Sequence, residues 1–317
     1  MKRYSFVDIA TQVYIGSVAL LVLFFHGSRL QAWPWVLLGH VAVFALIHGL
    51  IQFAARFPAN RPLDFLRQYY PVPLYIGLYC ETELLNQMIH AGYLDAHFLR
   101  FEKWLFGMQP GLELMQRFPS RLLAEVLYAA YFSYYVMIAG LGLALLFRDR
   151  RQFVHFISIV SFVLYACYTL YIFLPVVGPP IVYRGPVAVT LPQEVLGTTN
   201  LDPPETVQSS VFFRIMGWIY DHFEAAGAAF PSSHVAVAFC TVYFSFLYFR
   251  RIRYWHLIAA ILLCVSTVYC RYHYVVDVAA GLVTAAVLVP LGNRLYFRFE
   301  KRKAARLCDE HNHTPRS

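Results

Sequence analysis

Residues 230–281 read FPSSHVAVAFCTVYFSFLYFRRIRYWHLIAAILLCVSTVYCRYHYVVDVAAG and decide the architecture of the chain. Two apolar stretches flank a short arginine-rich turn, and a histidine motif stands at each outer end of the pair. FPSSHVAV (230–237) carries His234, and CRYHYVVDVAAG (270–281) carries His273. Apolar stretches of this kind predict two membrane helices that run out and back. The hairpin therefore returns both histidines to the same face of the membrane.

The composition of the whole chain indicates a polytopic membrane protein. Of its 317 residues, 59% are hydrophobic, 17% are aromatic and only 14% are charged, which is too apolar for a soluble globular domain. A helix needs roughly 20 residues to cross about 30 Å of hydrocarbon. We predict an all-α bundle of about eight spans, with a six-helix catalytic core and extra helices at the N-terminus. The predicted spans cover residues 11–25, 33–54, 72–91, 122–147, 153–177, 231–249, 254–270 and 274–296.

The positive charges predict the orientation of this bundle, because Lys and Arg are enriched in cytoplasmic loops. With eight spans and the N-terminus inside, most of the 26 basic residues fall in cytoplasmic loops. Both termini are then cytoplasmic, and the histidine motifs face the extracytoplasmic (periplasmic or lumenal) side. Omitting the third span would reverse the first two helices and move Lys2 and Arg3 outside. The formal charge of +8 fits this topology and contact with anionic lipids, and no motif indicates nucleic acid.

Three regions follow from this layout. Residues 1–120 form N-terminal membrane helices and an amphipathic segment in the interface, 121–297 form the catalytic membrane domain, and 298–317 form a basic cytoplasmic tail. A long proline-rich connection, 178–230, leads directly into the first histidine motif. A connection of that length without strong secondary structure is usually functional or disordered.

The first histidine motif has the features of a helix start that binds phosphate. Pro231 suits the first turn of a helix, and Ser232 and Ser233 offer hydroxyls beside backbone N–H groups. These N–H groups and the positive end of the helix dipole attract an anion to the same point. His234 stands within the first turn, where it can donate a proton.

The second motif supplies a complementary group. His273 and Asp277 are four residues apart, which places them on one face of a helix. A carboxylate at that spacing can accept a hydrogen bond from one ring nitrogen, so that the other nitrogen is free to attack phosphorus.

Together these motifs resemble those of the type 2 phosphatidic acid phosphatase superfamily, in which a P-S-x-H segment is followed by H-x-x-x-D. The resemblance implies that His273 is the nucleophile that forms a phosphohistidine, that His234 protonates the leaving group and that Asp277 orients His273. It implies neither a metal nor another cofactor. The superfamily's K-x6-R-P motif is absent, and Ser266 and Thr267 stand where it has a Ser-Arg pair.

These departures point to one branch of the superfamily and to other phosphate ligands. STVYCRYHYVVDVAAG and GPPIVYRGP resemble segments of inositol phosphorylceramide synthases and, more loosely, sphingomyelin synthases. Because the usual cations are missing, we predict Arg184 and Arg271 as phosphate-binding residues, together with Ser232 and Ser233. The alternative for both arginines is an interfacial anchor.

Three carboxylates, Glu81, Glu83 and Glu125, fall within predicted spans, where charge is costly and often functional. Either they line a polar cavity that admits an acceptor hydroxyl, or they pair internally. The sequence leaves both alternatives open.

The predicted function is a lipid phosphotransferase that moves a phosphate-containing head group from a membrane phospholipid donor to a lipid or polyol hydroxyl. Attack by water instead would make the same site a lipid phosphate phosphatase. A transporter that uses intramembrane Glu and His is a third hypothesis, although it does not explain the PSSH motif. The sequence names neither donor nor acceptor, and it predicts no oligomeric state.

Overall fold

The computed structural model describes residues 3–184, 193–197 and 201–313, and helices are the regular elements of this part of the chain. The all-α prediction is confirmed. Five of the described helices are long and apolar enough to cross a membrane, and two shorter helices are also apolar. The long ones are α1 (Phe6–Phe25), α2 (Trp33–Arg56), α7 (Arg121–Arg148), α8 (Arg150–Phe173) and α15 (Val275–His313). The shorter ones are α13 (Ser233–Tyr248) and α14 (Arg253–Tyr269).

The predicted third span is where the structure departs from the eight-span expectation. The helix there, α4 (Pro71–Leu85), has 15 residues and ends at Asn86, where the expected span continued to residue 91. At 1.5 Å per residue, such a helix covers about 22 Å, less than the roughly 30 Å of a bilayer core. A short helix, α3 (Arg61–Tyr69), precedes it. The five long and two shorter apolar helices do not include α4, which packs against α8.

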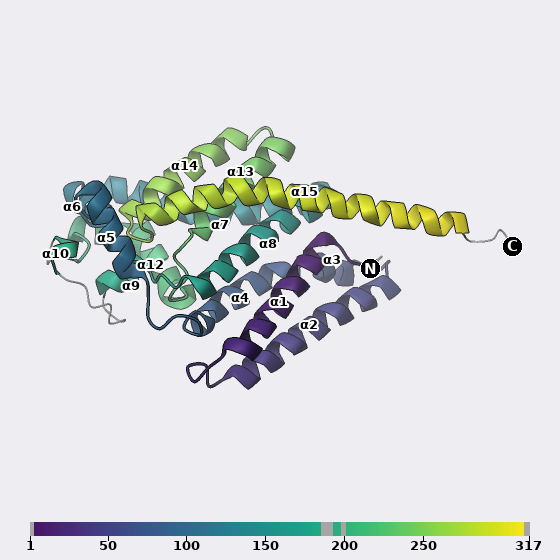
Figure 1. Cartoon of the computed structure of the whole chain (residues 1–317). Helices are drawn as coiled ribbons and strands as arrows, with labels where there is room; N and C mark the ends of the chain where they lie inside the picture. Colours follow the sequence, from purple (N-terminus) through teal and green to yellow (C-terminus); the bar gives the residue numbers. More distant parts are fainter. Residues whose placement is uncertain (1–2, 185–192, 198–200, 314–317) are drawn as a thin grey trace.

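Helix α8 occupies the centre of the bundle, where it contacts α1, α4, α7, α13 and α15. Its position explains why most of its side chains are buried, including aromatic residues such as Phe153, Phe156 and Tyr171. Helices α13 and α14 form the predicted hairpin, and α15 packs along α13. This arrangement brings the start of α13 and the start of α15 to one end of the molecule (Figure 1).

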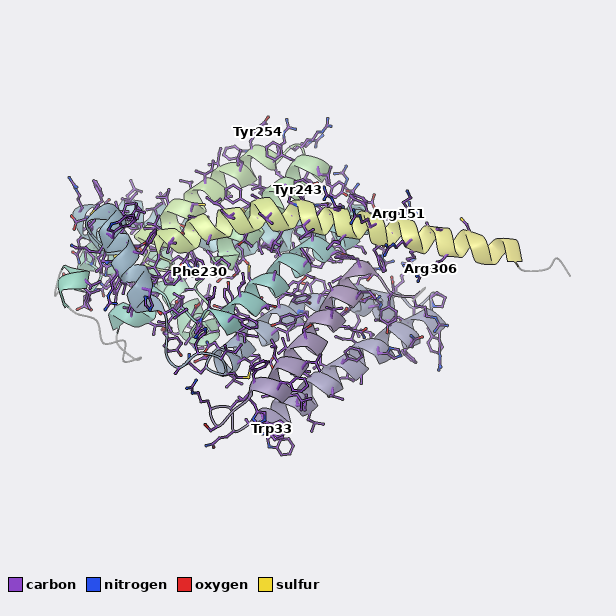
Figure 2. All side chains as sticks on the ribbon, in the orientation of Figure 1. Trp33, Arg151, Phe230, Tyr243, Tyr254 and Arg306 are labelled. Atoms are coloured by element: carbon purple, nitrogen blue, oxygen red, sulfur yellow. The ribbon has the colours of Figure 1, made fainter. Side chains whose placement is uncertain are left out.

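The two ends of the bundle differ. The short helices α5 (Asp95–Phe106), α6 (Pro110–Arg117), α9 (Pro179–Arg184), α10 (Gln193–Leu196) and α12 (Val211–Phe223) gather at one end, and the two termini lie toward the other (Figure 1). Figure 2 shows Arg151 and Arg306 toward the end of the termini, and Phe230 near the opposite end. Phe230, at the start of the first histidine motif, thus lies far from these two arginines. That the termini face the cytoplasm remains a prediction from the charges.

At both predicted region boundaries, the structure joins the regions on the two sides. Helix α15 runs without a break past residue 298 to His313, so the basic segment continues the last membrane helix. Helices α5 and α6 precede the expected boundary at residue 120, yet α5 contacts α15 and α6 contacts α14. These two helices therefore pack directly on the part of the chain that carries His273. A four-residue helix, α11 (Glu205–Gln208), contacts α7 and α12.

Candidate functional site

The first histidine motif forms the start of α13. Ser232 is the N-cap, and its hydroxyl accepts a hydrogen bond from the Val235 N–H at 3.3 Å. The Ser233 N–H donates to the Tyr171 hydroxyl at 3.2 Å, and this hydroxyl donates to the Pro231 carbonyl at 3.0 Å. The start of the helix is thereby fixed against α8, and it holds His234 within the first turn.

The second motif forms a tight turn between α14 and α15. The Thr267 carbonyl accepts hydrogen bonds from the Tyr272 N–H at 2.9 Å and the His273 N–H at 3.0 Å. Arg271 adopts a left-handed conformation with φ of 59°, which few residues other than glycine adopt without strain. The turn places His273 before the first residue of α15, with its side chain only 5% exposed.

Asp277 in the first turn of α15 holds His273 as the spacing predicts. Its Oδ2 accepts a hydrogen bond from the Tyr274 N–H at 2.9 Å and lies 3.3 Å from His273 Nδ1. Burial, the largest effect, lowers the pKa of His273 to about 4, and a hydrogen bond to the Ala229 carbonyl opposes this shift. The imidazole is therefore neutral at pH 7, as a nucleophile must be.

The two histidine rings lie side by side. Their centroids are 5.7 Å apart and their planes are inclined by 59°. A backbone hydrogen bond of 3.1 Å from the Ser232 N–H to the Asp277 carbonyl ties the start of α13 to the start of α15. At this separation both rings can reach one phosphoryl group, since attack and proton transfer each need about 3 Å.

Helix α5 contributes two buried carboxylates that support the turn and that the sequence analysis did not identify. Glu102 accepts hydrogen bonds from the Val275 N–H at 2.5 Å and from the Val276 N–H, so it caps α15. Asp95 accepts from the N–H groups of Val177 and Gly178 and from the Tyr274 hydroxyl, each at 2.9 Å. Burial raises the pKa of Asp95 and raises that of Glu102 to about 7.

Several buried polar atoms around the turn have no hydrogen-bond partner among the described residues. They are Nε and Nη2 of Arg271, Oδ1 of Asp277 and Nδ1 of His234. Arg271 is 4% exposed, and its Nη1 donates to the Leu201 carbonyl at 2.6 Å. Buried guanidinium donors are costly unless an anion or acceptor satisfies them. An anionic ligand such as a phosphate group has the chemistry to do so.

The other predicted site residues are placed as follows. The side chain of Arg184 lies outside the described part of the structure, although its backbone ends α9. Glu81 lies 3.5 Å from His40, as the pairing alternative predicts. Glu83 is exposed, and Glu125 accepts hydrogen bonds from the Val211 and Phe212 N–H groups, so it caps α12.

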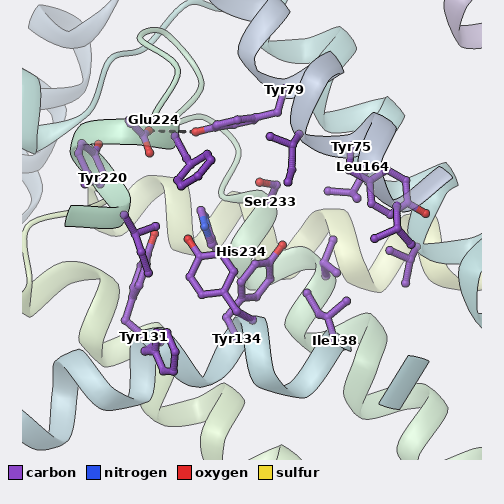
Figure 3. Close-up of a pocket in the computed structure, with 18 of the residues that line it drawn as sticks. Tyr75, Tyr79, Tyr131, Tyr134, Ile138, Leu164, Tyr220, Glu224, Ser233 and His234 are labelled. Carbon is purple, nitrogen blue, oxygen red and sulfur yellow. Dashed lines mark hydrogen bonds between the residues drawn. The ribbon is translucent and has the colours of Figure 1, made fainter. Parts of the chain in front are cut away.

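A cavity of about 490 Å³ opens beside His234, between α4, α7, α8, α12 and α13 (Figure 3). Aromatic side chains form most of its wall, and Ser233 and His234 lie at its inner side. The described residues that line it do not include Glu81, Glu83 or Glu125. Glu224, which the sequence analysis did not single out, lines it instead.

Among the described residues, no group of three or more His, Cys, Asp and Glu side chains is arranged to hold a metal ion. The described site offers two imidazoles, a carboxylate and a guanidinium. A neutral His273 oriented by Asp277 can attack, and His234 can exchange a proton with an oxygen in the cavity.

Comparison with known proteins agrees with this chemistry. The sequence profile of the PAP2 superfamily matches residues 96–291, which is more than half of the chain and includes both histidine motifs. The match begins within α5, the helix that carries Glu102. No curated protein and no solved structure gave a significant match. With its apolar helices and its matched motifs, the chain is a membrane protein that belongs to the PAP2 superfamily.

Proposed function

We propose that the protein is an integral-membrane lipid phosphotransferase that works through a phosphohistidine intermediate. The convergence of His234 with the His273–Asp277 pair, 5.7 Å apart beside an apolar cavity, carries this proposal. Membership of the PAP2 superfamily supports the general class, lipid phosphatase or phosphotransferase.

The reaction proceeds in two steps on this arrangement. The free nitrogen of His273 attacks phosphorus of a phospholipid, a P–N bond forms, the P–O bond to the lipid alcohol breaks, and His234 gives its proton to the departing oxygen. In the second step a hydroxyl attacks the phosphohistidine, its proton passes to His234, and the P–N bond breaks. Asp277 stabilises the positive charge that His273 carries between these steps. Arg271 neutralises the phosphoryl oxygens.

The surroundings of the site favour a hydroxyl acceptor over water. His273 and Asp277 are 5% and 0% exposed, and the cavity that reaches His234 is lined mostly by aromatic rings. An apolar cavity holds water poorly, because a buried water needs two to four polar partners. The resemblance of the Ser266-Thr267 and double-proline segments to inositol phosphorylceramide synthases supports transfer of a head group to a sphingolipid. The arginine distribution supports an active site on the extracytoplasmic side.

Purified protein in mixed micelles tests the proposal with phosphorus-labelled phosphatidic acid and phosphatidylinositol, each with and without diacylglycerol, ceramide or glycerol. A new labelled lipid that appears only with an acceptor supports the transferase. Release of inorganic phosphate from phosphatidic acid, without transfer, assigns a phosphatase. Retention of activity by His273→Gln would remove the phosphohistidine mechanism.

A further inference from the structure

Several tyrosine hydroxyls at the cavity beside His234 are engaged by the protein. The Tyr75 hydroxyl pairs with the Ser161 hydroxyl at 2.6 Å, and the Tyr168 hydroxyl donates to the Tyr75 carbonyl at 3.2 Å. The rings of these residues, rather than their hydroxyls, therefore form the wall. A volume of about 490 Å³ suits a ligand with a substantial apolar body.

Glu224 is the carboxyl group among the described residues that line this cavity. It caps the end of α12, where its N–H donates to the Tyr220 carbonyl at 3.1 Å. The Tyr79 hydroxyl donates to its Oε1 at 3.0 Å (Figure 3), and the Tyr220 hydroxyl also forms a hydrogen bond with the carboxyl. Two tyrosines from different helices thus hold the group at the wall.

The protonation state of Glu224 suits a neutral ligand. The pKa of Glu224 is raised to about 8, because burial, the largest effect, outweighs the hydrogen bonds from Tyr79 and Tyr220 that lower it, and Glu83 adds a smaller rise. At pH 7 the group is mostly protonated, so it can both donate and accept a hydrogen bond. An alcohol hydroxyl, which also both donates and accepts, matches such a partner.

The reaction itself determines which part of a substrate enters the cavity. His234 exchanges a proton with the alcohol oxygen in both steps, and by microscopic reversibility the departing and the attacking oxygen occupy the same place. His234 lines the cavity, whereas Arg271, the cation for the phosphoryl oxygens, is not among its lining residues. The alcohol therefore lies on the cavity side of the two histidines, and the phosphoryl group lies between the rings.

We propose that Glu224, held by Tyr79 and Tyr220, binds the hydroxyl of the lipid alcohol that leaves from or attacks phosphorus at His234. Glu224 is then the specificity-determining residue for an acceptor that has a neutral hydroxyl on an apolar body. This inference rests on the phosphohistidine mechanism proposed above. It adds a substrate-binding residue that lies outside both histidine motifs.

The test separates the phosphohistidine step from acceptor binding. A p-nitrophenyl phosphate monoester or diester serves as donor, because p-nitrophenol is an acidic leaving group that departs with little help from hydrogen bonds, and dioctanoylglycerol serves as acceptor. Glu224→Leu should still give a first-turnover burst of p-nitrophenol when no acceptor is present, while steady-state transfer to dioctanoylglycerol falls at least tenfold with a raised KM for the acceptor. Glu224→Gln, which keeps a donor and an acceptor, should retain transfer within about threefold.

The matched control is Asp221→Leu, which removes an exposed carboxyl from the same helix and should leave transfer unchanged. If Glu224→Leu does not fold, Tyr79→Phe replaces it. This variant keeps the ring and removes one hydrogen bond to Glu224, and we expect steady-state transfer to fall about threefold while the first-turnover burst of p-nitrophenol is retained.

A second pair of variants tests whether the acceptor alcohol binds inside the cavity. Ile138→Trp fills space inside it, whereas Val136→Trp adds the same ring to the outer face of the same helix, where Val136 is 58% exposed. Only Ile138→Trp should raise the KM for dioctanoylglycerol.

The outcomes separate this inference from the proposed function. Wild-type transfer by folded Glu224→Leu and Ile138→Trp overturns the role of Glu224 and leaves the phosphohistidine mechanism intact. Failure of the wild-type protein to release p-nitrophenol from either donor, or release by His273→Gln, overturns the mechanism and the inference with it.

Discussion

Gly281 offers a sharp test of whether the contact between α13 and α15 sets the geometry of the two histidines. A Cβ atom at this position would lie 2.6 Å from the Ser232 carbonyl oxygen and 3.0 Å from Val235 Cβ. Ser232 is the residue that caps α13 and that donates its N–H to the Asp277 carbonyl. Gly281→Ala therefore pushes apart the two helix starts that carry His234 and Asp277.

The size of the effect follows from these distances. Ordinary contact begins at 3.4 Å, so the helices must separate by about 0.8 Å. A misplacement of about 1 Å in a catalytic arrangement can cost about 10²-fold in rate. We expect kcat/KM of Gly281→Ala to fall about 10²-fold, which corresponds to about 2.7 kcal/mol of lost transition-state stabilisation. Overpacking should also lower the free energy of unfolding by about 1–3 kcal/mol.

Two glycine variants separate displacement of the site from loss of stability. Gly292→Ala, on the same helix, would place a Cβ 3.0 Å from the Phe162 ring, away from the histidines. It should lower thermal stability while kcat/KM per folded molecule stays near wild type. Gly140→Ala meets nothing within 4 Å and should change neither quantity appreciably. The assay is p-nitrophenol release together with a thermal melt in detergent, and a Gly281→Ala variant with wild-type kcat/KM would refute the reasoning.

Three further predictions concern the turn that carries His273. Asp277→Asn removes the carboxylate that orients the ring and should slow phosphohistidine formation at least 10²-fold in a rapid-quench experiment, whereas an unchanged burst would exclude an orienting role. Arg271→Gln should raise the inhibition constant of inorganic phosphate about tenfold or more, and Arg271→Lys should restore part of the affinity for phosphate. Equal inhibition of the wild type and both variants would show that Arg271 does not bind phosphate. The pKa of His273 is lowered to about 4, and protonation removes the nucleophile. The rate of phosphohistidine formation should therefore be constant from pH 7 to about 5 and decline below about 4. A midpoint near pH 6.5 would contradict the argument that burial lowers this pKa.

The sequence predicted the parts of the site that depend on local chemistry. Helix-cap residues at 231–233 and the spacing of His273 and Asp277 are read from neighbouring positions, and the apolar hairpin between the motifs fixes which end they share. The structure accordingly places the rings of His234 and His273 5.7 Å apart. The left-handed conformation of Arg271 was not predicted, because residues other than glycine seldom adopt it.

The parts that could not be predicted depend on tertiary contacts. Glu102 and Asp95 lie in an amphipathic segment that the sequence assigned to the membrane interface, and only the packing of α5 on α15 buries them against the turn. The one feature of the sequence that could have indicated their burial is a carboxylate at a helix position where an apolar residue is expected. Glu224 lies outside the predicted spans, so nothing in its neighbourhood indicated burial. Conversely, Glu83 falls within a predicted span, yet it is exposed.

The balance between transfer and hydrolysis follows from the same contacts that make the cavity apolar. A water molecule that attacks the phosphohistidine and gives its proton to His234 would need two to four polar partners to hold it there. The hydroxyls of Tyr75, Tyr79 and Tyr168 already bond to protein atoms, so these three are less available to water. A lipid alcohol brings its own apolar body to the rings and needs only Glu224 and His234 for its hydroxyl. Freeing a tyrosine hydroxyl, as in Ser161→Ala, should therefore shift product from transferred lipid toward free phosphate.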